Sequence, residues 1–535
     1  MLISDPLGSA FLQKSQYGVP ALPSDLLARR CYIRCSQFGQ LSPSVACLAG
    51  GPRASETAAI TMPSTPTLIR SGAGFHKDVF DVPGADPIRF LKALGGEPRG
   101  FWGRQNRWVA WGGALARIEV RSGSGQSRFD EVRAETRRMF RRIYTDWGSL
   151  PFRERPRLFG GFSFLEDGGL DPTWSGFPAA GFVLPRVILE ASGDQVRFRV
   201  AGVTPWGTPG SDPETEELAA SLLEVLSNPR PAGLPPNGHS GEPTSASAAS
   251  DAPADRVSDV SSAGRKEWEE SVRAILRAVE EGSVQKAVLA RVLETEFTQP
   301  VDSLVSLGFL RSENRRAHVY LFEPHAGRTF LGAAPEVLAE LRGGRLRATA
   351  VAGSIPRGKT DDEDQELARV LIESEKNRSE HDLTVKEMVR ALDPRLSDMQ
   401  TEDRPRVLAL ARIQHLETAI SGTPEAQEDI LSLVESLHPT PAVCGSPRDG
   451  AQVLIRSAEA FDRGWYAGPL GWFDLAGEGD FVPGLRAAIG HGRRWRLFAG
   501  AGIVAGSDPS EEWEETALKF EAALRALRVG AGESP

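Results

Sequence analysis

The sequence predicts an α+β fold, with antiparallel strands in series and helices between groups of strands. Two observations support this prediction. Short segments with strand-like patterns, such as 284–297, recur along the chain and are separated by turn residues. Amphipathic segments with apolar side chains at helical spacing, such as 268–279, lie between groups of these strands. The chain shows no repeat period of the solenoid kind.

The composition is that of an ordinary soluble globular protein. Of the 535 residues, 40% are apolar and 25% charged, and the net charge of −9 gives no general attraction to nucleic acid or anionic membranes. No apolar run approaches the roughly 20 residues that span a bilayer, and the N-terminus lacks a secretory signal pattern. The four cysteines show neither zinc nor disulfide spacing. We therefore expect a cytoplasmic protein that acts on a small molecule, with no nucleic-acid or membrane partner.

Composition divides the chain into four parts. Residues 1–61 mix Ser, Pro, Ala and Gly with little periodicity, which predicts a disordered tail, a start assigned too early, or a transit peptide. Residues 62–227 contain strand-like segments and then a helix. Residues 228–262 are rich in Pro, Ser and Ala and predict a flexible linker or surface insertion. Residues 263–530 form the second structured region.

The second region opens with a helix and a strand. Apolar side chains recur at helical spacing over 268–279, and Gly282 ends that helix. In the strand at 284–297, alternation puts Lys286 on the same face as Val288 and other apolar residues. Desolvation there favours a neutral amine, as a general base requires. A lysine that reaches water at the strand end is the structural alternative.

Further strands follow, with a hairpin predicted across Gly343 and Gly344. The segment GAAPE delivers Glu336 to a strand terminus, which suits a general acid, although an exposed loop glutamate fits the same pattern. The return strand leads to Gly353 and Ser354. Their amides and hydroxyl are candidates for binding a carboxylate, although a Gly-Ser turn alone is a weak signal.

Two helices are predicted after this turn. Glu373, Asn377, Glu380 and Thr384 are expected on one polar helix face, with His381 beside them. His381 is expected to pack or to support a ligand, because hard cations prefer oxygen. A carboxylate such as Glu380 could meet one from the last helix around a hard cation. Magnesium suits coordination by carboxylates, water and a carboxylated substrate.

The last helix has the strongest signals in the chain. Asp508 is a candidate N-cap, a proline follows it, and Glu511 is spaced as in a capping box. On this helix Glu512, Glu515 and Lys519 align on one face. Glu512 and Glu515 either supply the second set of carboxylates or form, with Lys519, a solvated face with Glu–Lys pairs.

An arginine is expected inside a strand in the segment FVPGLRAAI. Arg486 is placed there to bind a substrate carboxylate through two parallel hydrogen bonds, or to cap the sheet edge. Pro483 in the same segment predicts a bulge or an edge strand.

Taken in order, these motifs resemble those of the chorismate-utilising enzymes, and those of isochorismate synthases most closely. The resemblance covers about 268–527 closely, and parts of 62–227 are similar to the more variable N-terminal part of the family. The matching motifs are QKAVLAR, GAAPE, AGSIPRG, EKNRSEH, HLETAISG, LHPTPAVCG, RGWYAGPLGW, GLRAAI and AGAGIVAGSDPSEEWEET.

The resemblance implies one large α+β domain of two halves, with antiparallel sheets flanked by helices and a magnesium-dependent site between the halves. It implies that Lys286 activates water for attack at C2 of chorismate and that Glu336 protonates the departing C4 hydroxyl. Glu380 and Glu515 would hold Mg²⁺, and Glu512 would assist through water.

The resemblance assigns a further set of positions to substrate binding. These are Gly353, Ser354, His415, Tyr466, Arg486, Gly500, Gly502 and Lys519. It also implies a role in menaquinone or siderophore biosynthesis. No glutamine amidotransferase subunit is expected, because the nucleophile in this branch is water and not ammonia.

Three other branches of the family carry different signatures. Aminodeoxychorismate synthases have a second lysine where this chain has Ala352, and anthranilate synthases usually lack the lysine at 286. Salicylate synthases share that lysine but typically have a glutamate where this chain has Asn377. The resemblance therefore favours release of isochorismate, with salicylate synthase as the alternative. A non-catalytic chorismate-binding relative is a further alternative, which the presence of Lys286 and Glu336 disfavours.

Overall fold

The structure is a computed structural model that describes residues 67–71, 76–121, 127–143, 155–168, 171–202, 212–227, 256–259 and 264–535. The chain separates into Met1–Thr61 and Met62–Pro535, and every described residue belongs to the second unit. The expected tail at 1–61 and most of the expected linker at 228–262 lie outside the described residues, so these two predictions remain predictions.

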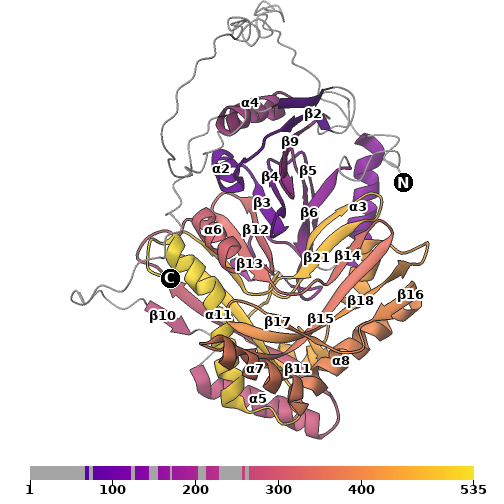
Figure 1. The fold of residues 1–535 in the computed structure, drawn as a ribbon, viewed down its shortest axis with the longest axis vertical. Coiled ribbons are helices and arrows are strands. Elements are labelled where there is room, and N and C mark those ends of the chain that lie inside the picture. The colour runs from indigo at the N-terminus through magenta and orange to yellow at the C-terminus, as the bar shows by residue number, and fades with distance from the viewer. Residues whose placement is uncertain are drawn as a thin grey trace, which may run out of the picture. The chain divides into compact units, whose positions relative to one another are not determined.

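Within the described residues the first sheet has 13 strands, and neighbouring strands are antiparallel (Figure 1). Its strands, in spatial order, are β1 (Thr67–Ser71), β2 (His76–Asp81), β9 (Gln195–Ala201), β8 (Val187–Ser192), β4 (Arg107–Gly112), β3 (Arg99–Arg104), β12 (His318–His325), β13 (Arg328–Ala334), β22 (Ala487–His491), β23 (Arg494–Ile503), β11 (Lys286–Glu296) and β10 (Arg256–Asp259), with β19 (Gly445–Ser446) paired to β11. The two halves of the chain join where β3 pairs with β12.

The second sheet has 10 strands in the part of the chain that the structure describes, and it is also antiparallel. Its strands, in spatial order, are β16 (Leu396–Thr401), β18 (Ile413–Pro424), β15 (Arg345–Pro356), β14 (Ala339–Arg342), β21 (Gly479–Pro483), β20 (Pro469–Asp474), β6 (Arg157–Phe162), β7 (Ala180–Leu184) and β5 (Ala116–Val120), with β17 (Arg406–Ala409) paired to β18. Here the halves join where β20 pairs with β6. Each sheet is therefore continuous across both halves, and the predicted α+β class is confirmed.

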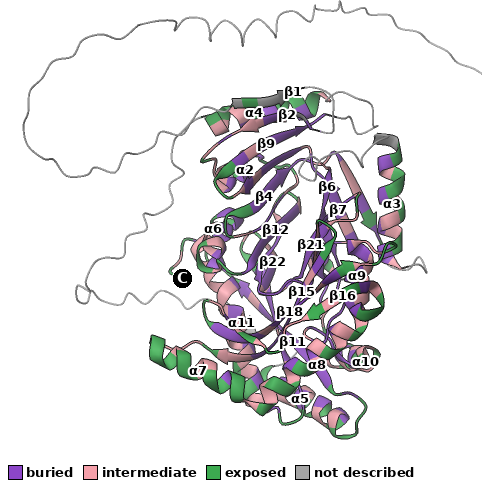
Figure 2. Ribbon diagram, turned by 45° about the vertical axis from the view of Figure 1, so that its right-hand side comes forward, coloured by how far each residue is buried: buried purple, intermediate pink, exposed green. Residues whose placement is uncertain are grey.

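Helices cover the sheets, and most of the strand residues are buried (Figure 2). Apolar side chains from both sheets belong to one core cluster. The helices are α2 (Pro87–Ala93), α3 (Arg128–Ile143), α4 (Pro213–Ser227), α5 (Gly264–Glu280), α6 (Ser303–Glu313), α7 (Asp361–Glu373), α8 (Glu375–Leu392), α9 (Ile430–Leu437), α10 (Arg448–Ala458) and α11 (Pro509–Gly530). Side chains of α2, α4, α6 and α11 pack on the first sheet, and those of α3, α8 and α9 pack on the second.

Aromatic residues dominate the space between the two sheets. Trp111 of β4 stacks on Phe159 of β6 with ring centroids 5.9 Å apart, and Trp174 packs against Phe498 of β23 at 5.5 Å. Burying such large rings is a main source of folding free energy, at about 25 cal/mol per Å² of apolar surface removed from water. This core fixes the two sheets against each other and thereby holds the strands that carry the site.

Local sequence signals explain the elements nearest the site. Asp508 caps α11 by accepting hydrogen bonds from the amides of Ser510 and Glu511, as predicted. The carboxylate of Glu511 does not complete a capping box in the described contacts. Gly343 and Gly344 form the predicted two-residue hairpin between β14 and β15, both with positive φ, which glycine adopts readily.

Two local predictions were wrong. Glu373 ends α7, and Ser374 starts α8 as its N-cap by accepting a hydrogen bond from the amide of Asn377. The helix break removes Glu373 from the face that Glu380 occupies. Arg486 lies between β21 and β22 instead of inside a strand, with φ of +51°.

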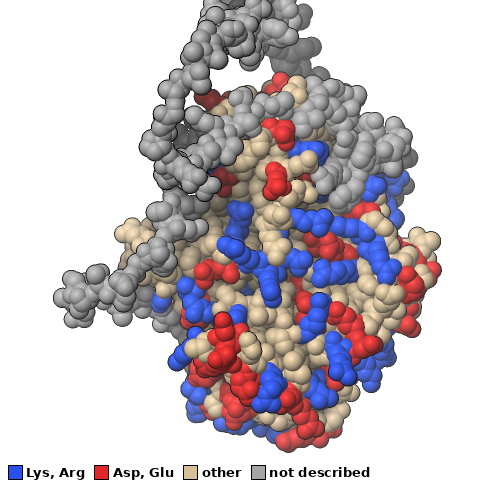
Figure 3. All heavy atoms as spheres, in the orientation of Figure 1, with Lys and Arg blue, Asp and Glu red and all other residues tan. Residues whose placement is uncertain are grey.

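None of the helices in the described part of the chain combines the length and apolar character needed to span a bilayer. On the face drawn in Figure 3, basic and acidic side chains are intermixed. Although the net charge is −9, the acidic side chains on that face do not form one continuous acidic surface.

Candidate active site

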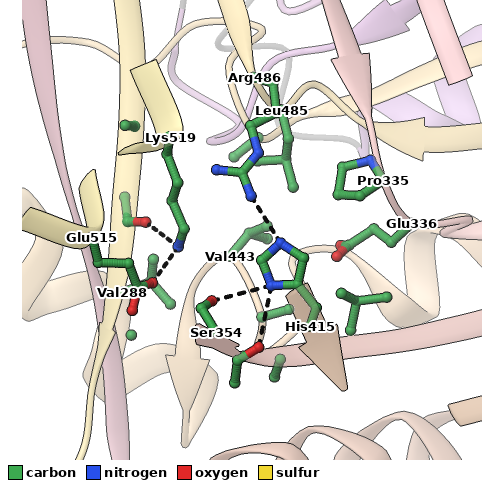
Figure 4. Close-up of a pocket in the computed structure, with 18 of the residues that line it drawn as sticks. Val288, Pro335, Glu336, Ser354, His415, Val443, Leu485, Arg486, Glu515 and Lys519 are labelled. Carbon is green, nitrogen blue, oxygen red and sulfur yellow. Dashed lines mark hydrogen bonds and ion pairs between the residues drawn. The ribbon is translucent and has the colours of Figure 1, made fainter. Parts of the chain in front are cut away.

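A pocket of about 670 Å³ lies where the two sheets and two helices meet (Figure 4). Its walls come from β11 and β23 of the first sheet, β15 and β18 of the second, and the helices α8 and α11. All the predicted site residues line this pocket except Lys286 and Glu512, which lie directly behind its wall in ion pairs. The convergence of several charged and polar side chains on one pocket suits a small polar ligand.

Lys286 is the first residue of β11, and its side chain has no exposed surface. Its Nζ lies 2.9 Å from Oε1 of Glu380, although the angles are not those of a hydrogen bond. Gly502 faces this pair from β23, where a Cβ atom would lie 2.3 Å from Glu380 Oε1 and 2.8 Å from Lys286 Cε. Glycine at 502 therefore leaves the space that the Lys286–Glu380 pair occupies.

The close approach of Gly502 to the Lys286–Glu380 pair predicts the effect of adding one methyl group at position 502. Gly502→Ala should displace the Lys286–Glu380 pair and lower kcat by roughly tenfold to a hundredfold, because small misplacements of reacting groups are costly. Gly308→Ala, on α6 and outside the pocket, is the control, since its Cβ would meet no heavy atom within 4 Å. Steady-state kinetics with a melting curve for each variant would test this. Equal losses of activity in both variants would contradict the explanation.

Glu336 follows β13 and Pro335, and its side chain points into the pocket opposite Lys519 and Glu515 (Figure 4). Only 5% of the residue is exposed. Burial raises the pKa of Glu336 to about 8, against the opposing effect of the charges of Lys286 and Arg486. The carboxyl group is therefore protonated at neutral pH, as a general acid must be.

The raised pKa of Glu336 predicts a pH dependence. Turnover that needs the protonated acid should fall as the pH rises through about 8. The folded-state pKa lies above the ordinary 4.5, so the group's contribution to stability is complete below about 4.5 and is lost as the pH rises through about 8. Glu336→Gln should be nearly inactive and should melt less pH-dependently than the native protein over that window. A kcat that stays flat to pH 9.5 in the native enzyme would contradict this.

Arg486 lines the pocket and is held in place by a chain of hydrogen bonds (Figure 4). Its Nη2 donates to Nε2 of His415 at 2.9 Å, so Nδ1 of His415 carries the proton and lies 3.2 Å from the carbonyl oxygen of Gly353. Nδ1 is also 3.1 Å from Oγ of Ser354. Burial, together with the positive charge of Arg486, lowers the pKa of His415 to about 3. His415 is therefore a neutral support for Arg486.

The backbone of Arg486 is held in the left-handed region, which is uncommon for a residue with a side chain and is typical of functional sites. Burial lowers the pKa of Arg486 to about 10, so its guanidinium remains charged at neutral pH. A fixed guanidinium at the pocket wall is suited to binding a carboxylate.

Lys519 and Tyr466 complete the polar wall on the side of β23. Nζ of Lys519 donates to the carbonyl oxygen of Gly500 at 2.8 Å and pairs with Oε1 of Glu515 at 2.6 Å. Tyr466 stacks on Phe498 with ring centroids 5.1 Å apart. Burial raises the pKa of Tyr466 to about 12, so its hydroxyl can donate a hydrogen bond to an anion.

The three predicted metal-binding glutamates differ in position. Glu380 and Glu515 line the pocket, whereas Glu512 is 2% exposed and pairs with Lys376 at 2.7 Å. Within the described ranges, no three Asp, Glu, His or Cys side chains come together as a complete ligand set. Magnesium usually keeps several waters and takes one or two carboxylates plus substrate oxygens, so two carboxylates on the wall fit this ion.

The protonation of these glutamates follows from their surroundings. Although burial acts in the opposite direction, Lys519 holds the pKa of Glu515 below its ordinary value. Burial, and then the charge of Glu515, raise the pKa of Glu512. Glu515 is therefore available as an anionic ligand at neutral pH.

Asn377 is a site residue whose role the sequence did not reveal. Its Oδ1 accepts a hydrogen bond of 3.2 Å from the amide of Ser354, so α8 fixes the turn at 353–354. The signal was its place in EKNRSEH, one turn before Glu380. His381 does not line the pocket, and its Nε2 lies 2.7 Å from Oγ1 of Thr418, which agrees with the predicted packing role.

Comparison with known proteins identifies the family. The family model described as a chorismate binding enzyme matches residues 73–528. The chain belongs to the chorismate-binding enzymes. This match includes both halves of the two sheets, and it confirms the family that the motif order resembles.

Several chorismate-binding enzymes are similar over most of the chain. The salicylate biosynthesis isochorismate synthase of Pseudomonas aeruginosa is 35% identical over 458 residues, covering 85% of this chain and 90% of that protein. Isochorismate synthase MenF of Bacillus subtilis is 32% identical over 372 residues, covering 70% and 74%. The solved structure of MenF, the menaquinone-specific isochorismate synthase from Escherichia coli, has a TM-score of 0.65 at 25% identity, covering 88% and 96%.

Proposed function

We propose that this protein is an isochorismate synthase, which converts chorismate into isochorismate by adding water at C2 and expelling the C4 hydroxyl. The observations that carry the proposal are the fully buried amine of Lys286, 2.9 Å from Glu380 of the pocket wall, and the protonated carboxyl group of Glu336, which lines the same pocket. An amine and a neutral carboxyl group are the base and the acid that this exchange of hydroxyl groups needs. The relatives that cover most of the chain carry the same activity in their names.

The chemistry requires Lys286 to be neutral before it accepts a proton from water. Nζ of Lys286 lies 2.9 Å from Oε1 of Glu380, and the side chain of Lys286 has no exposed surface. On the other side of the reaction, Glu336 donates its proton to the departing hydroxyl, and proton exchange with solvent restores both groups.

We also propose that the enzyme uses Mg²⁺, held by Glu380 and Glu515, with Glu512 acting through water. Support comes from the two carboxylates on the pocket wall and from the preference of Mg²⁺ for oxygen ligands. When bound, the ion would supply positive charge to the ring carboxylate of the substrate. A cation there would also engage the Glu380 charge that otherwise pairs with Lys286.

The remaining polar groups fit a substrate with two carboxylates. Arg486, oriented by His415, supplies a fixed guanidinium, and Lys519 of α11 supplies an ammonium group. Tyr466 and the backbone around Gly353 add hydrogen-bond donors near these charges. Charge-assisted hydrogen bonds of this kind hold and orient carboxylates.

The proposed product is isochorismate, released without elimination of pyruvate. Asn377, which binds the turn at 353–354, stands where salicylate synthases typically have a glutamate. Water is the nucleophile, so we propose that no glutamine amidotransferase subunit is needed. The relatives named for salicylate biosynthesis and for menaquinone make siderophore or menaquinone biosynthesis the candidate pathways.

Product analysis tests this function. The purified protein should convert chorismate into isochorismate when MgCl₂ is present and should stop when excess chelator is added. Chromatography and NMR should find isochorismate and chorismate at equilibrium. Salicylate with pyruvate as the main products would identify a salicylate synthase, and unchanged chorismate would indicate a non-catalytic relative.

A further inference from the structure

Each of the three glutamates of the proposed metal site is paired with a lysine. Glu380 pairs with Lys286, Glu515 pairs with Lys519 at 2.6 Å, and Glu512 pairs with Lys376 at 2.7 Å. Each carboxylate of this cluster therefore already has an amine partner. A divalent cation that bound while all three lysines kept their positions would place two positive charges close to their ammonium groups. Such a placement is unfavourable at short range.

The three lysines differ in how firmly they are held. Lys286 has no exposed surface, and Lys519 is held by the carbonyl oxygen of Gly500 as well as by Glu515. The side chain of Lys376 is 30% exposed, and within the described residues Glu512 is its one recorded ion-pair and hydrogen-bond partner, while the charges of Glu515 and Glu380 also act on it. Lys376 lies in the first turn of α8 and is the most exposed of the three lysines.

Glu512 has much less access to solvent than Lys376. Its side chain is 2% exposed, on the buried face of α11. A buried carboxylate needs a cation or hydrogen-bond donors, because leaving it unpaired is costly. When the Lys376 ammonium leaves, a nearby hydrated cation is the natural replacement.

We propose that Lys376 is an internal counter-ion that competes with the divalent cation for Glu512 and so sets the metal concentration at which the site fills. This inference rests on the proposed magnesium site. Lys376 acts by weakening metal binding in the resting protein and has no part in the bond-making steps. The inference predicts that removing this positive charge tightens metal binding, whereas a simple structural role predicts weaker binding or no change.

Equilibrium binding of Mg²⁺ to the full chain, measured by isothermal titration calorimetry without chorismate, tests the proposal. Lys376→Met keeps the length of the side chain and removes its charge, and it should lower the Kd for Mg²⁺ by about tenfold or more. Lys376→Arg keeps the charge and should stay within about threefold of the native Kd. Lys386→Met, an exposed position on the same helix, is the matched control and should leave the Kd unchanged.

The outcomes separate this inference from the magnesium assignment. If the native protein binds Mg²⁺ and Lys376→Met binds it no more tightly, the counter-ion role is wrong and the metal site stands. If neither protein binds Mg²⁺ at millimolar concentration, the counter-ion role is wrong, and the loss of turnover in excess chelator still decides the metal site. Binding of Mg²⁺ by Lys376→Met alone would support strong competition. A melting curve of each variant with and without Mg²⁺ gives a second readout, since a ligand of the folded state raises Tm.

Discussion

Lys286→Ala should lower kcat for isochorismate formation by roughly two to four orders of magnitude, the usual contribution of a positioned general base. The side chain of Lys286 is fully buried and lies 2.9 Å from Glu380 of the pocket wall. Chorismate should still bind, because Arg486 and Lys519 continue to hold its carboxylates. Kinetics together with calorimetric binding would separate the two effects.

Lys286→Arg should be almost as inactive as Lys286→Ala. A guanidinium stays protonated and cannot accept the proton from water, although it keeps the positive charge beside Glu380. Lys386→Ala, at an exposed position on α8, is the control and should keep native activity. An arginine variant with normal turnover would mean that residue 286 supplies only a fixed charge and that the base is another group.

Glu380→Gln and Glu515→Gln should each nearly abolish turnover. Both carboxylates line the pocket, and a hard cation loses much of its affinity when an anionic ligand becomes a neutral amide. Glutamine keeps the shape of the side chain, so a melting curve can show that the fold is retained. Activity should be measured from micromolar to tens of millimolar MgCl₂.

Glu511→Ala is the control for these variants, because Glu511 is exposed on the same helix as Glu515. It should leave both turnover and the Mg²⁺ dependence unchanged. Full activity of Glu380→Gln in excess chelator would contradict a metal role for this residue. Recovery of Glu515→Gln at high MgCl₂ would agree with it, since weak binding is then overcome by concentration.

The motifs with strong local signals could be predicted from sequence. The cap at Asp508 starts α11 where expected, which aligns Glu515 and Lys519 on the face that lines the pocket. The strand alternation around Lys286 correctly indicated a buried lysine at the start of a strand. Such features depend on neighbours a few residues apart, and those neighbours are visible in the sequence.

The features that could not be predicted depend on long-range contacts or on rare backbone conformations. Lys286 and Glu380 are far apart in the chain, and only the packing of α8 against the sheets brings them to 2.9 Å. Arg486 has a φ of +51°, which no periodic pattern encodes, so a strand was expected there. The pairing of Lys376 with Glu512 likewise requires the first turns of α8 and α11 to meet.

The source of the new hydroxyl group tests the central claim most directly. The native enzyme should be incubated with chorismate and MgCl₂ in water enriched in oxygen-18 and stopped at low conversion, and the isochorismate should be analysed by mass spectrometry and NMR. Water attack assisted by Lys286 predicts one solvent oxygen in the C2 hydroxyl group and loss of the original C4 hydroxyl oxygen. Isochorismate that carries the unlabelled C4 oxygen at C2 would show direct transfer of the hydroxyl group and would contradict the assignment of Lys286 and Glu336.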